Sequence, residues 1–171
     1  GDDRARRCMT MIADHGALAS TMAPGKFDVT RSTGWCFRTL VKYYELSGDP
    51  RYRPFVDKAA DLIWRDVDKA GTTGTGTWQL GIYARAAIHA WLTTGDERMR
   101  DLALGCADWA RTYEVGTEGY PYHAQKEPWS LKPEDRGERC AWANAYLLEP
   151  LAFAFSQTGD SSENGISFRF I

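Results

Sequence analysis

The segment GWCFRTLVKYYELSGDPRYRPFVDKAADLIW, residues 34–64, decides the fold because the chain repeats it. Residues 81–111 read GIYARAAIHAWLTTGDERMRDLALGCADWAR and align with it without a gap, 47 positions further on. The matching pairs are Gly34 and Gly81, Arg38 and Arg85, Tyr44 and Trp91, Gly48 and Gly95, Asp49 and Asp96, Arg51 and Arg98, Ala60 and Ala107, and Asp61 and Asp108. A period of this length is typical of proteins built from repeated helix pairs.

A third copy of the first half, AYLLEPLAFAFSQTGD, occupies residues 145–160, another 64 positions on. Each copy contains the sequence Ser-Gly-Asp or Thr-Gly-Asp, which predicts a turn between two helices. The glycine suits the left-handed conformation after a helix, and the aspartate suits the N-cap of the next one. The turns are Gly48–Asp49, Gly95–Asp96 and Gly159–Asp160, and Pro50 suits the first position of the helix that follows.

The helices on the two sides of each turn differ in their hydrophobic pattern. Segments 34–46, 79–93 and 140–156 are apolar nearly all round, which predicts inner helices covered on several sides, whereas 51–66 and 97–112 are amphipathic and suit an outer layer. An amphipathic helix at 4–22, with Ala5, Cys8, Met9, Ile12 and Ala19 as its apolar stripe, precedes them. We therefore expect an all-α domain of antiparallel helical hairpins in two layers, with pairs around 34–66, 79–112 and 140–157 and an irregular tail at 161–171.

The connections predict where a functional site lies. Inner-to-outer turns are short, but the outer-to-inner connections around 23–33, 68–78 and 114–137 are long and would gather at the N-terminal ends of the inner helices. Long loops on one face of a rigid scaffold commonly carry function.

The recurring [ST]-G-D-x-R-[YM] pattern between inner and outer helices, over about residues 5–160, resembles the (α/α) toroid of six-hairpin glycosidases, polysaccharide lyases and sugar epimerases. The resemblance implies a carbohydrate-active enzyme that binds an oligosaccharide or polysaccharide at the inner-helix N-termini. Six hairpins of this period need about 282 residues, so the chain corresponds to an incomplete toroid of about three hairpins. An open arc exposes apolar surface, which predicts a homo-oligomer formed through its open edge.

Composition narrows the partners further. The 21 Lys and Arg against 23 Asp and Glu, for a net charge of -2, give no reason to expect nucleic acid or a membrane surface as a partner. No apolar run has the length of a membrane span, and the N-terminus shows no signal peptide, so the localisation stays open. Aromatic residues make up 13% of the chain, enough to fill a core or to line a sugar site.

The segment 114–139 is the richest in chemical groups. A glycosidase needs two carboxyl groups, for which Glu127, Glu134, Asp135 and Glu138 are candidates. A lyase abstracts the proton next to a uronate carboxylate, for which Tyr122 and His123 are candidates. The alternative is a solvated loop whose acids cap the next helix. The predicted catalytic residues are His123, Tyr122 and Glu138.

Residues near the inner-helix N-termini are candidates for substrate binding, since flat rings stack on sugar faces and polar groups orient hydroxyls or carboxylates. They are Trp35, Arg38, Trp78, Gln79, Tyr120, Glu127, Trp129, Arg139, Trp142, Asn144 and Tyr146. Packing at the rim of the core is the alternative for the tryptophans. Because Arg38, Arg85 and Glu149 share one repeat position, a structural ion pair is the alternative for Arg38. We expect His15 and His89 to be packing or hydrogen-bonded histidines.

Two other functions stay open. The Gly34-Trp35-Cys36 run faintly resembles lanthionine cyclases, which are helical toroids that hold zinc through two Cys and one His; Cys36, Cys140 and His123 would then be the ligands. Ordinary buried thiols are the other reading of the cysteines, and no metal or other cofactor is expected for the glycosidase or lyase. The second alternative is a non-catalytic helical repeat scaffold, which the half-ring length favours.

Overall fold

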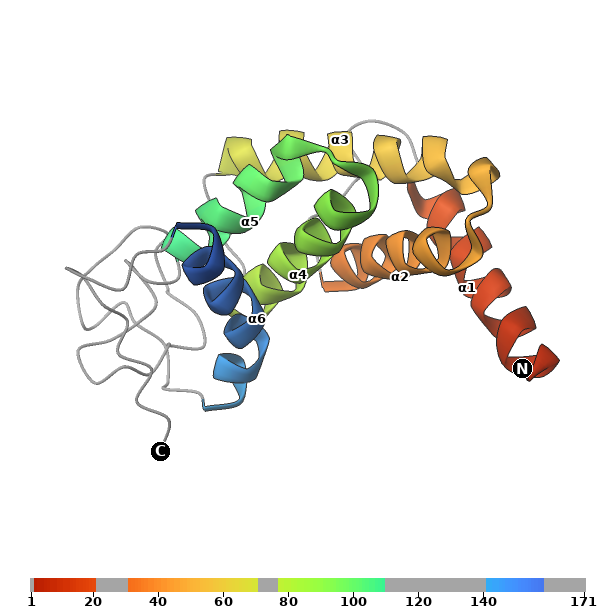
Figure 1. Cartoon of the computed structure of the whole chain (residues 1–171), viewed down its shortest axis with the longest axis horizontal. Coiled ribbons are helices and arrows are strands. Elements are labelled where there is room, and N and C mark those ends of the chain that lie inside the picture. Colours follow the sequence, from red (N-terminus) through yellow and green to blue (C-terminus); the bar gives the residue numbers. More distant parts are fainter. Residues whose placement is uncertain (1, 21–30, 71–76, 110–140, 159–171) are drawn as a thin grey trace.

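The computed structural model describes residues 2–20, 31–70, 77–109 and 141–158, and every regular element in these ranges is a helix (Figure 1). The helices are α1 (Asp3–Ser20), α2 (Arg31–Ser47), α3 (Arg53–Ala70), α4 (Thr77–Thr94), α5 (Glu97–Trp109) and α6 (Ala141–Thr158), and the short 3-10 helix η1 (Pro50–Tyr52) precedes α3. The all-α class predicted from the periodicity is confirmed. The 161–171 tail and the third Gly-Asp turn lie outside the described residues.

The first two Gly-Asp turns share one backbone conformation. Gly48 has a φ of 62° and Gly95 a φ of 75°, in the left-handed region that only glycine adopts without strain. The N–H of Gly48 donates to the carbonyl oxygen of Tyr44 at 2.9 Å, and the N–H of Gly95 donates to that of Trp91 at 2.8 Å. Both contacts satisfy carbonyl groups at the ends of α2 and α4, as the sequence predicts.

Asp49 and Asp96 cap the helices that follow these turns. Each carboxylate accepts the backbone N–H two residues on, from Arg51 at 3.0 Å and from Arg98 at 3.1 Å. The guanidinium of the same arginine returns to the same carboxylate, with Nη2 to Oδ2 distances of 2.6 Å and 2.7 Å. Hydrogen bonds from these arginines lower the pKa of both carboxyl groups. The Gly-Asp-x-Arg sequence therefore provides both the C-terminal cap of one helix and the N-terminal cap of the next.

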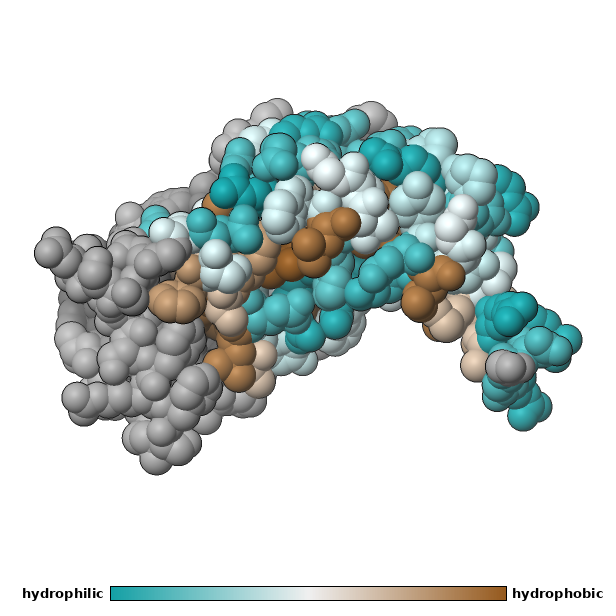
Figure 2. Space-filling view, viewed as in Figure 1, coloured by the Kyte–Doolittle hydropathy of each residue, from teal (hydrophilic) through white to brown (hydrophobic). Residues whose placement is uncertain are grey.

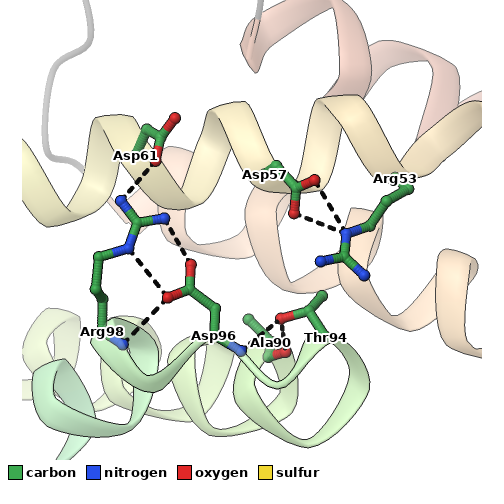
Figure 3. A network of polar contacts seen from close by, with 7 residues as sticks. All are labelled: Arg53, Asp57, Asp61, Ala90, Thr94, Asp96 and Arg98. Carbon is green, nitrogen blue, oxygen red and sulfur yellow. Dashed lines mark hydrogen bonds and ion pairs between the residues drawn. The ribbon is translucent and has the colours of Figure 1, made fainter.

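The second turn is also fastened to a neighbouring helix (Figure 3). Arg98 donates from Nη1 to Oδ1 of Asp61 on α3 at 2.7 Å, so it joins the first turn of α5 to the middle of α3. Arg51, its counterpart at the first turn, has an 80% exposed side chain, and its only ion pair among the described residues is with Asp49. Chemically equivalent turns thus differ in their tertiary contacts.

Helices α2, α4 and α6 form a row in which α4 contacts both of the others. Gly34 of α2 faces α4, where a Cβ atom on it would stand 2.8 Å from Cγ2 of Ile82. Gly81 of α4 faces α6, where a Cβ atom would stand 2.5 Å from the carbonyl oxygen of Tyr146. The two glycines are equivalent in the repeat, as are Ile82 and Tyr146, so both contacts use the same part of the repeat.

The remaining helices pack against this row. Helix α1 contacts α2 and α3, α3 contacts α2, and α5 contacts α4 and α6. The hydroxyl of Tyr52 donates to the carboxylate of Asp14 on α1 at 2.5 Å, and the hydroxyls of Thr10 and Tyr43 lie 2.9 Å apart. The first bond joins α1 to η1, and the second joins α1 to α2.

The core lies between the row and the helices packed on it. From Leu80 to Ala90, the side chains of α4 are buried except for half-buried Arg85 and His89. The stripes predicted for the amphipathic helices are confirmed where they are described: Val56, Ala59 and Ile63 of α3, and Met99, Leu102, Ala103 and Cys106 of α5, are buried.

Two predictions about burial are wrong. On α1 the expected apolar stripe of Cys8, Met9 and Ile12 is exposed, because the helix turns Ala13, Gly16 and Ala17 toward α2 instead, where small residues permit a close approach. On α6 the expected coverage on several sides is missing: Leu148 is 43% and Phe155 49% exposed. Figure 2 shows apolar surface over α6 and over α4.

None of the helices in the described ranges combines the length and the apolarity needed to cross a membrane.

Candidate functional site

Six ionisable side chains meet along one side of the row, and we refer to them as the charged cluster. Helix α2 contributes residues one helical turn apart, as does α4, and α6 contributes one carboxylate; such spacing places side chains on the same face of a helix. The members are Arg38, Lys42 and Glu45 of α2, Arg85 and His89 of α4, and Glu149 of α6.

Glu149 links α6 to α4. Its Oε2 accepts a hydrogen bond from Nε of Arg85 at 2.5 Å, and its Oε1 lies 3.3 Å from Nε2 of His89. All three side chains keep part of their surface in contact with solvent, at 27% for Arg85, 35% for Glu149 and 18% for His89. The ion pair expected at this repeat position is confirmed for Arg85 and Glu149, while Arg38 is not part of it.

The surroundings of His89 favour its neutral form. Partial burial is the main cause that lowers its pKa from the ordinary value of 6.5, and the positive charges of Lys42 and Arg38 lower it further against the opposing effect of Glu149 and Glu45. His89 is half-buried on α4 and lies 3.3 Å from a carboxylate oxygen of Glu149, so its neighbours make it part of a polar surface.

The α2 side of the cluster is richer in positive charge. Nζ of Lys42 donates to Oε2 of Glu45 at 2.7 Å, which lowers the pKa of that carboxyl group. Arg38 is half-buried, and within the described part of the chain it has neither a hydrogen bond nor an ion pair that would hold its guanidinium. The α2 side therefore offers a guanidinium and an ammonium group whose donors can reach a bound oxygen-rich molecule.

The other predicted substrate-binding residues are placed only in part. Trp35, 43% exposed, lies near the N-terminus of α2, and half-buried Tyr146 lies where α6 contacts Gly81. Trp78 and Gln79 are in the first turn of α4, and Trp142 and Asn144 are in the first turn of α6. The other candidates lie outside the described residues: Tyr120, Tyr122, His123, Glu127, Trp129, Glu134, Asp135, Glu138 and Arg139.

Of the charged cluster, only Arg38 is among the site residues predicted from sequence; Lys42, Glu45, Arg85, His89 and Glu149 are not. The spacing of these residues could have indicated the cluster. Residues 38, 42 and 45 lie on one face of α2, and residues 85 and 89 lie on the matching face of α4. Glu149 occupies the equivalent position of α6. A charged face on a helix that is otherwise apolar indicates a surface left open by the neighbouring helices.

In the described ranges, no three His, Cys, Asp or Glu side chains lie close enough together to hold a metal ion. These residues therefore provide no ligand set for the zinc alternative. Burial raises the pKa of the half-buried Cys36 thiol. Cys140 and His123 lie outside the described residues. Of the other cysteines, Cys106 is buried as expected, but Cys8 is exposed, contrary to the prediction of a buried thiol.

No protein-family model, no curated protein and no solved structure matches the chain.

Proposed function

We propose that α2, α4 and α6 are the inner helices, and α1, α3 and α5 the outer helices, of a partial (α/α) toroid. The repeated contacts of Gly34 with Ile82 and of Gly81 with Tyr146 support this arrangement, because both join the N-terminal parts of neighbouring helices of the row. The antiparallel placement of α1 on α2, in which Thr10 meets Tyr43 and Gly16 meets Cys36, suits a preceding outer helix.

We further propose that the chain belongs to a carbohydrate-active enzyme, a glycoside hydrolase or a polysaccharide lyase, and binds a sugar chain along the charged cluster. The observation that carries the proposal is the cluster itself, which is partly exposed and lies on the inner row. Arg38 and Lys42 provide donors for sugar hydroxyls or carboxylates, and the lowered pKa of His89 favours a neutral imidazole, which has one accepting nitrogen. Mixed donors and acceptors in one place match the mixed hydrogen-bonding pattern of a sugar.

Within this proposal the chemistry falls to the residues predicted from sequence. In a lyase, Tyr122 or His123 would remove the proton next to a uronate carboxylate as the glycosidic C–O bond breaks, and the new double bond conjugates with the carboxylate. In a hydrolase, Glu138 and a second carboxyl group would act as acid and as base or nucleophile, and water would add to the sugar. Only the first reaction creates an ultraviolet-absorbing product.

Binding is tested first, by calorimetry with neutral and uronate-containing oligosaccharides. We expect Arg38→Ala and Lys42→Ala each to weaken binding about tenfold, the effect of losing a charge-assisted hydrogen bond. Lys58→Ala removes an exposed lysine of α3, away from the cluster, and is the matched control. Absence of binding to every sugar, or an equal effect of Lys58→Ala, contradicts the proposal.

Catalysis is tested by incubating polysaccharides with the protein and following ultraviolet absorbance and new reducing ends in parallel. A rise in both indicates a lyase, and a rise in reducing ends alone indicates a hydrolase. We expect His123→Ala to abolish lyase activity and Glu138→Gln to abolish hydrolase activity, with sugar binding retained. Full activity in both variants rejects these catalytic assignments.

A non-catalytic scaffold is the second candidate, and the geometry of the turns favours it. The Gly-Asp-x-Arg sequence that carries much of the resemblance is fully used in capping helices, so a protein with no enzymatic function needs it equally. Sugar binding without turnover of any polysaccharide, in a protein whose helices are intact, supports this candidate over the enzyme.

A further inference from the structure

Helix α6 exposes the face that its counterparts in the repeat use to contact the next helix of the row. Its exposed residues along one stripe are Ala145, Leu148, Ala152 and Phe155. The spacing of three and four residues places them on one side of the helix. We call them the α6 stripe.

The equivalent positions are covered in α2 and α4. Ala145 corresponds to the buried Gly34 and Gly81, which contact the following helix. Leu148 corresponds to Phe37 and Ala84, which are 2% and 0% exposed.

The same holds further along the helix. Ala152 corresponds to Val41 and Ile88, which are 0% and 4% exposed. By the logic of the repeat, the α6 stripe is a helix-binding surface that none of the described helices covers.

Helix α2 has the opposite surface uncovered. In α4, Ile82 and Ala86 face the preceding helix of the row and are 2% and 0% exposed, but their counterparts in α2 are Trp35, which is 43% exposed, and Thr39, which is half-buried. No described helix covers Trp35 as α2 covers Ile82. The described helices therefore present both sides of one contact, and no other described helix covers either side.

We propose that two copies of this chain associate head to tail, with the α6 stripe of one copy packed on Trp35 and Thr39 of α2 in the other. The repeat predicts which residues pair. Gly34 contacts Ile82 and Gly81 contacts Tyr146 within the chain. By the same rule, Ala145 of one copy contacts Trp35 of the second copy. Two such contacts satisfy both surfaces of both copies and close the assembly as a dimer.

Charge complementarity supports this pairing. The Arg85–Glu149 ion pair joins equivalent positions of neighbouring helices, and the next pair in the series joins Glu149 to Arg38 of the second copy. These charges are opposite, and Arg38 has no ion-pair partner among the described residues. The dimer thus extends the charged cluster across the contact, while the association itself does not depend on sugar binding.

The experiment compares oligomeric states by sedimentation velocity over a range of concentrations of the 171-residue chain. We expect the parent to be a dimer, and Leu148→Asp and Trp35→Asp each to raise the dissociation constant at least tenfold. Leu92→Asp is the matched control, because Leu92 is 65% exposed on α4 outside the α6 stripe. Circular dichroism verifies that every variant keeps the parent's helix content.

Mixing the two disrupted variants separates head-to-tail association from other geometries. Leu148→Asp keeps an intact α2 surface and Trp35→Asp keeps an intact α6 stripe, so the mixture regains one contact and forms a heterodimer, although each variant alone is a monomer. A monomeric parent, an unlimited polymer, or a Trp35→Asp variant that still dimerises overturns the proposal. Sugar binding retained in the monomeric Leu148→Asp variant leaves the proposed function standing whatever the oligomeric outcome.

Discussion

Gly81 of α4 lies so close to Tyr146 of α6 that a Cβ atom on it would stand 2.5 Å from the Tyr146 carbonyl oxygen. Because the obstacle is backbone, it cannot rotate away as the end of a side chain can. The contact sets the spacing of α4 and α6, and its counterpart at Gly34 meets a side chain, Ile82, instead.

Alanine substitutions at three helical glycines should therefore have graded effects. We expect Gly81→Ala to lower the free energy of unfolding by about 2 kcal/mol and Gly34→Ala by about 1 kcal/mol, through overpacking. Gly105→Ala is the control, since nothing lies within 4 Å of its Cβ position, and it should stabilise α5 by about 1 kcal/mol. Urea denaturation measures all three; a stabilising Gly81→Ala contradicts the close packing.

The helix caps predict a second set of effects. Asp96→Ala should destabilise by about 1 kcal/mol, whereas Asp96→Asn, which keeps an accepting oxygen, should cost less. Because the folded-state pKa of Asp96 is lowered, its contribution is present above the unfolded value of 3.8 and is lost as the pH falls through the lowered pKa. Urea denaturation at pH 7 and pH 3 tests this: a parent–alanine difference that does not shrink at pH 3 argues against the charged cap.

The two arginines of the turns should differ in the same assay. Arg98→Ala should destabilise more than Arg51→Ala, because Arg98 also reaches Asp61 on α3. Both effects should stay within about 1 kcal/mol, as for exposed ion pairs. In the Asp61→Asn background, Arg98→Ala and Arg51→Ala should have equal effects. If the difference between them persists in that background, it is caused by a contact other than Arg98 with Asp61.

His89 provides a prediction for pH. The folded-state pKa of His89 lies below the unfolded value of 6.5. Between these two pKa values the unfolded protein binds more protons than the folded protein, so stability falls as the pH drops below 6.5. In NMR titrations we expect Lys42→Gln to raise the pKa of His89 and Glu149→Gln to lower it. His89→Gln identifies the resonance and should flatten this part of the stability profile. Shifts in the reverse directions would refute the charged cluster as described.

Tyr52 ties α1 to the first turn, and its removal should loosen that helix. The hydrogen bond to Asp14, together with burial, raises the pKa of Tyr52 to about 12. A raised phenol pKa means that stability holds below pH 10 and is lost as the pH rises from 10 toward 12. Tyr52→Phe should therefore speed hydrogen exchange in α1 and remove most of this alkaline dependence, while α5 exchanges as in the parent.

Local features of the fold were the most predictable from sequence. Gly48, Asp49 and their counterparts act through atoms two to four residues away, so the turns followed from residue type alone. The burial of Val56 and Met99 followed from helical periodicity. The face of α1 was predicted wrongly because Met9 and Ile12 looked like core residues, whereas tight contact with α2 selected Ala13 and Gly16.

The charged cluster was harder to predict, since it joins three helices that are far apart in sequence. The shared repeat position of Arg85 and Glu149 indicated their ion pair, but Lys42 and His89 became relevant only through the direction in which the helices pack. The open arc predicted exposed apolar surface at its edge, but the residues that form it, such as Leu148 and Phe155, were identified only from the packing of α6.

The construction of the Gly-Asp turns also bears on the order of folding. The hydrogen bonds that define them join residues two to four positions apart, such as Gly48 to Tyr44 and Arg51 to Asp49, and none of these bonds requires a distant part of the chain. Contacts of such short sequence separation form early, since little chain entropy is lost in closing them. We therefore expect the turns at Gly48 and Gly95 to form before the glycine contacts that bring α2, α4 and α6 together.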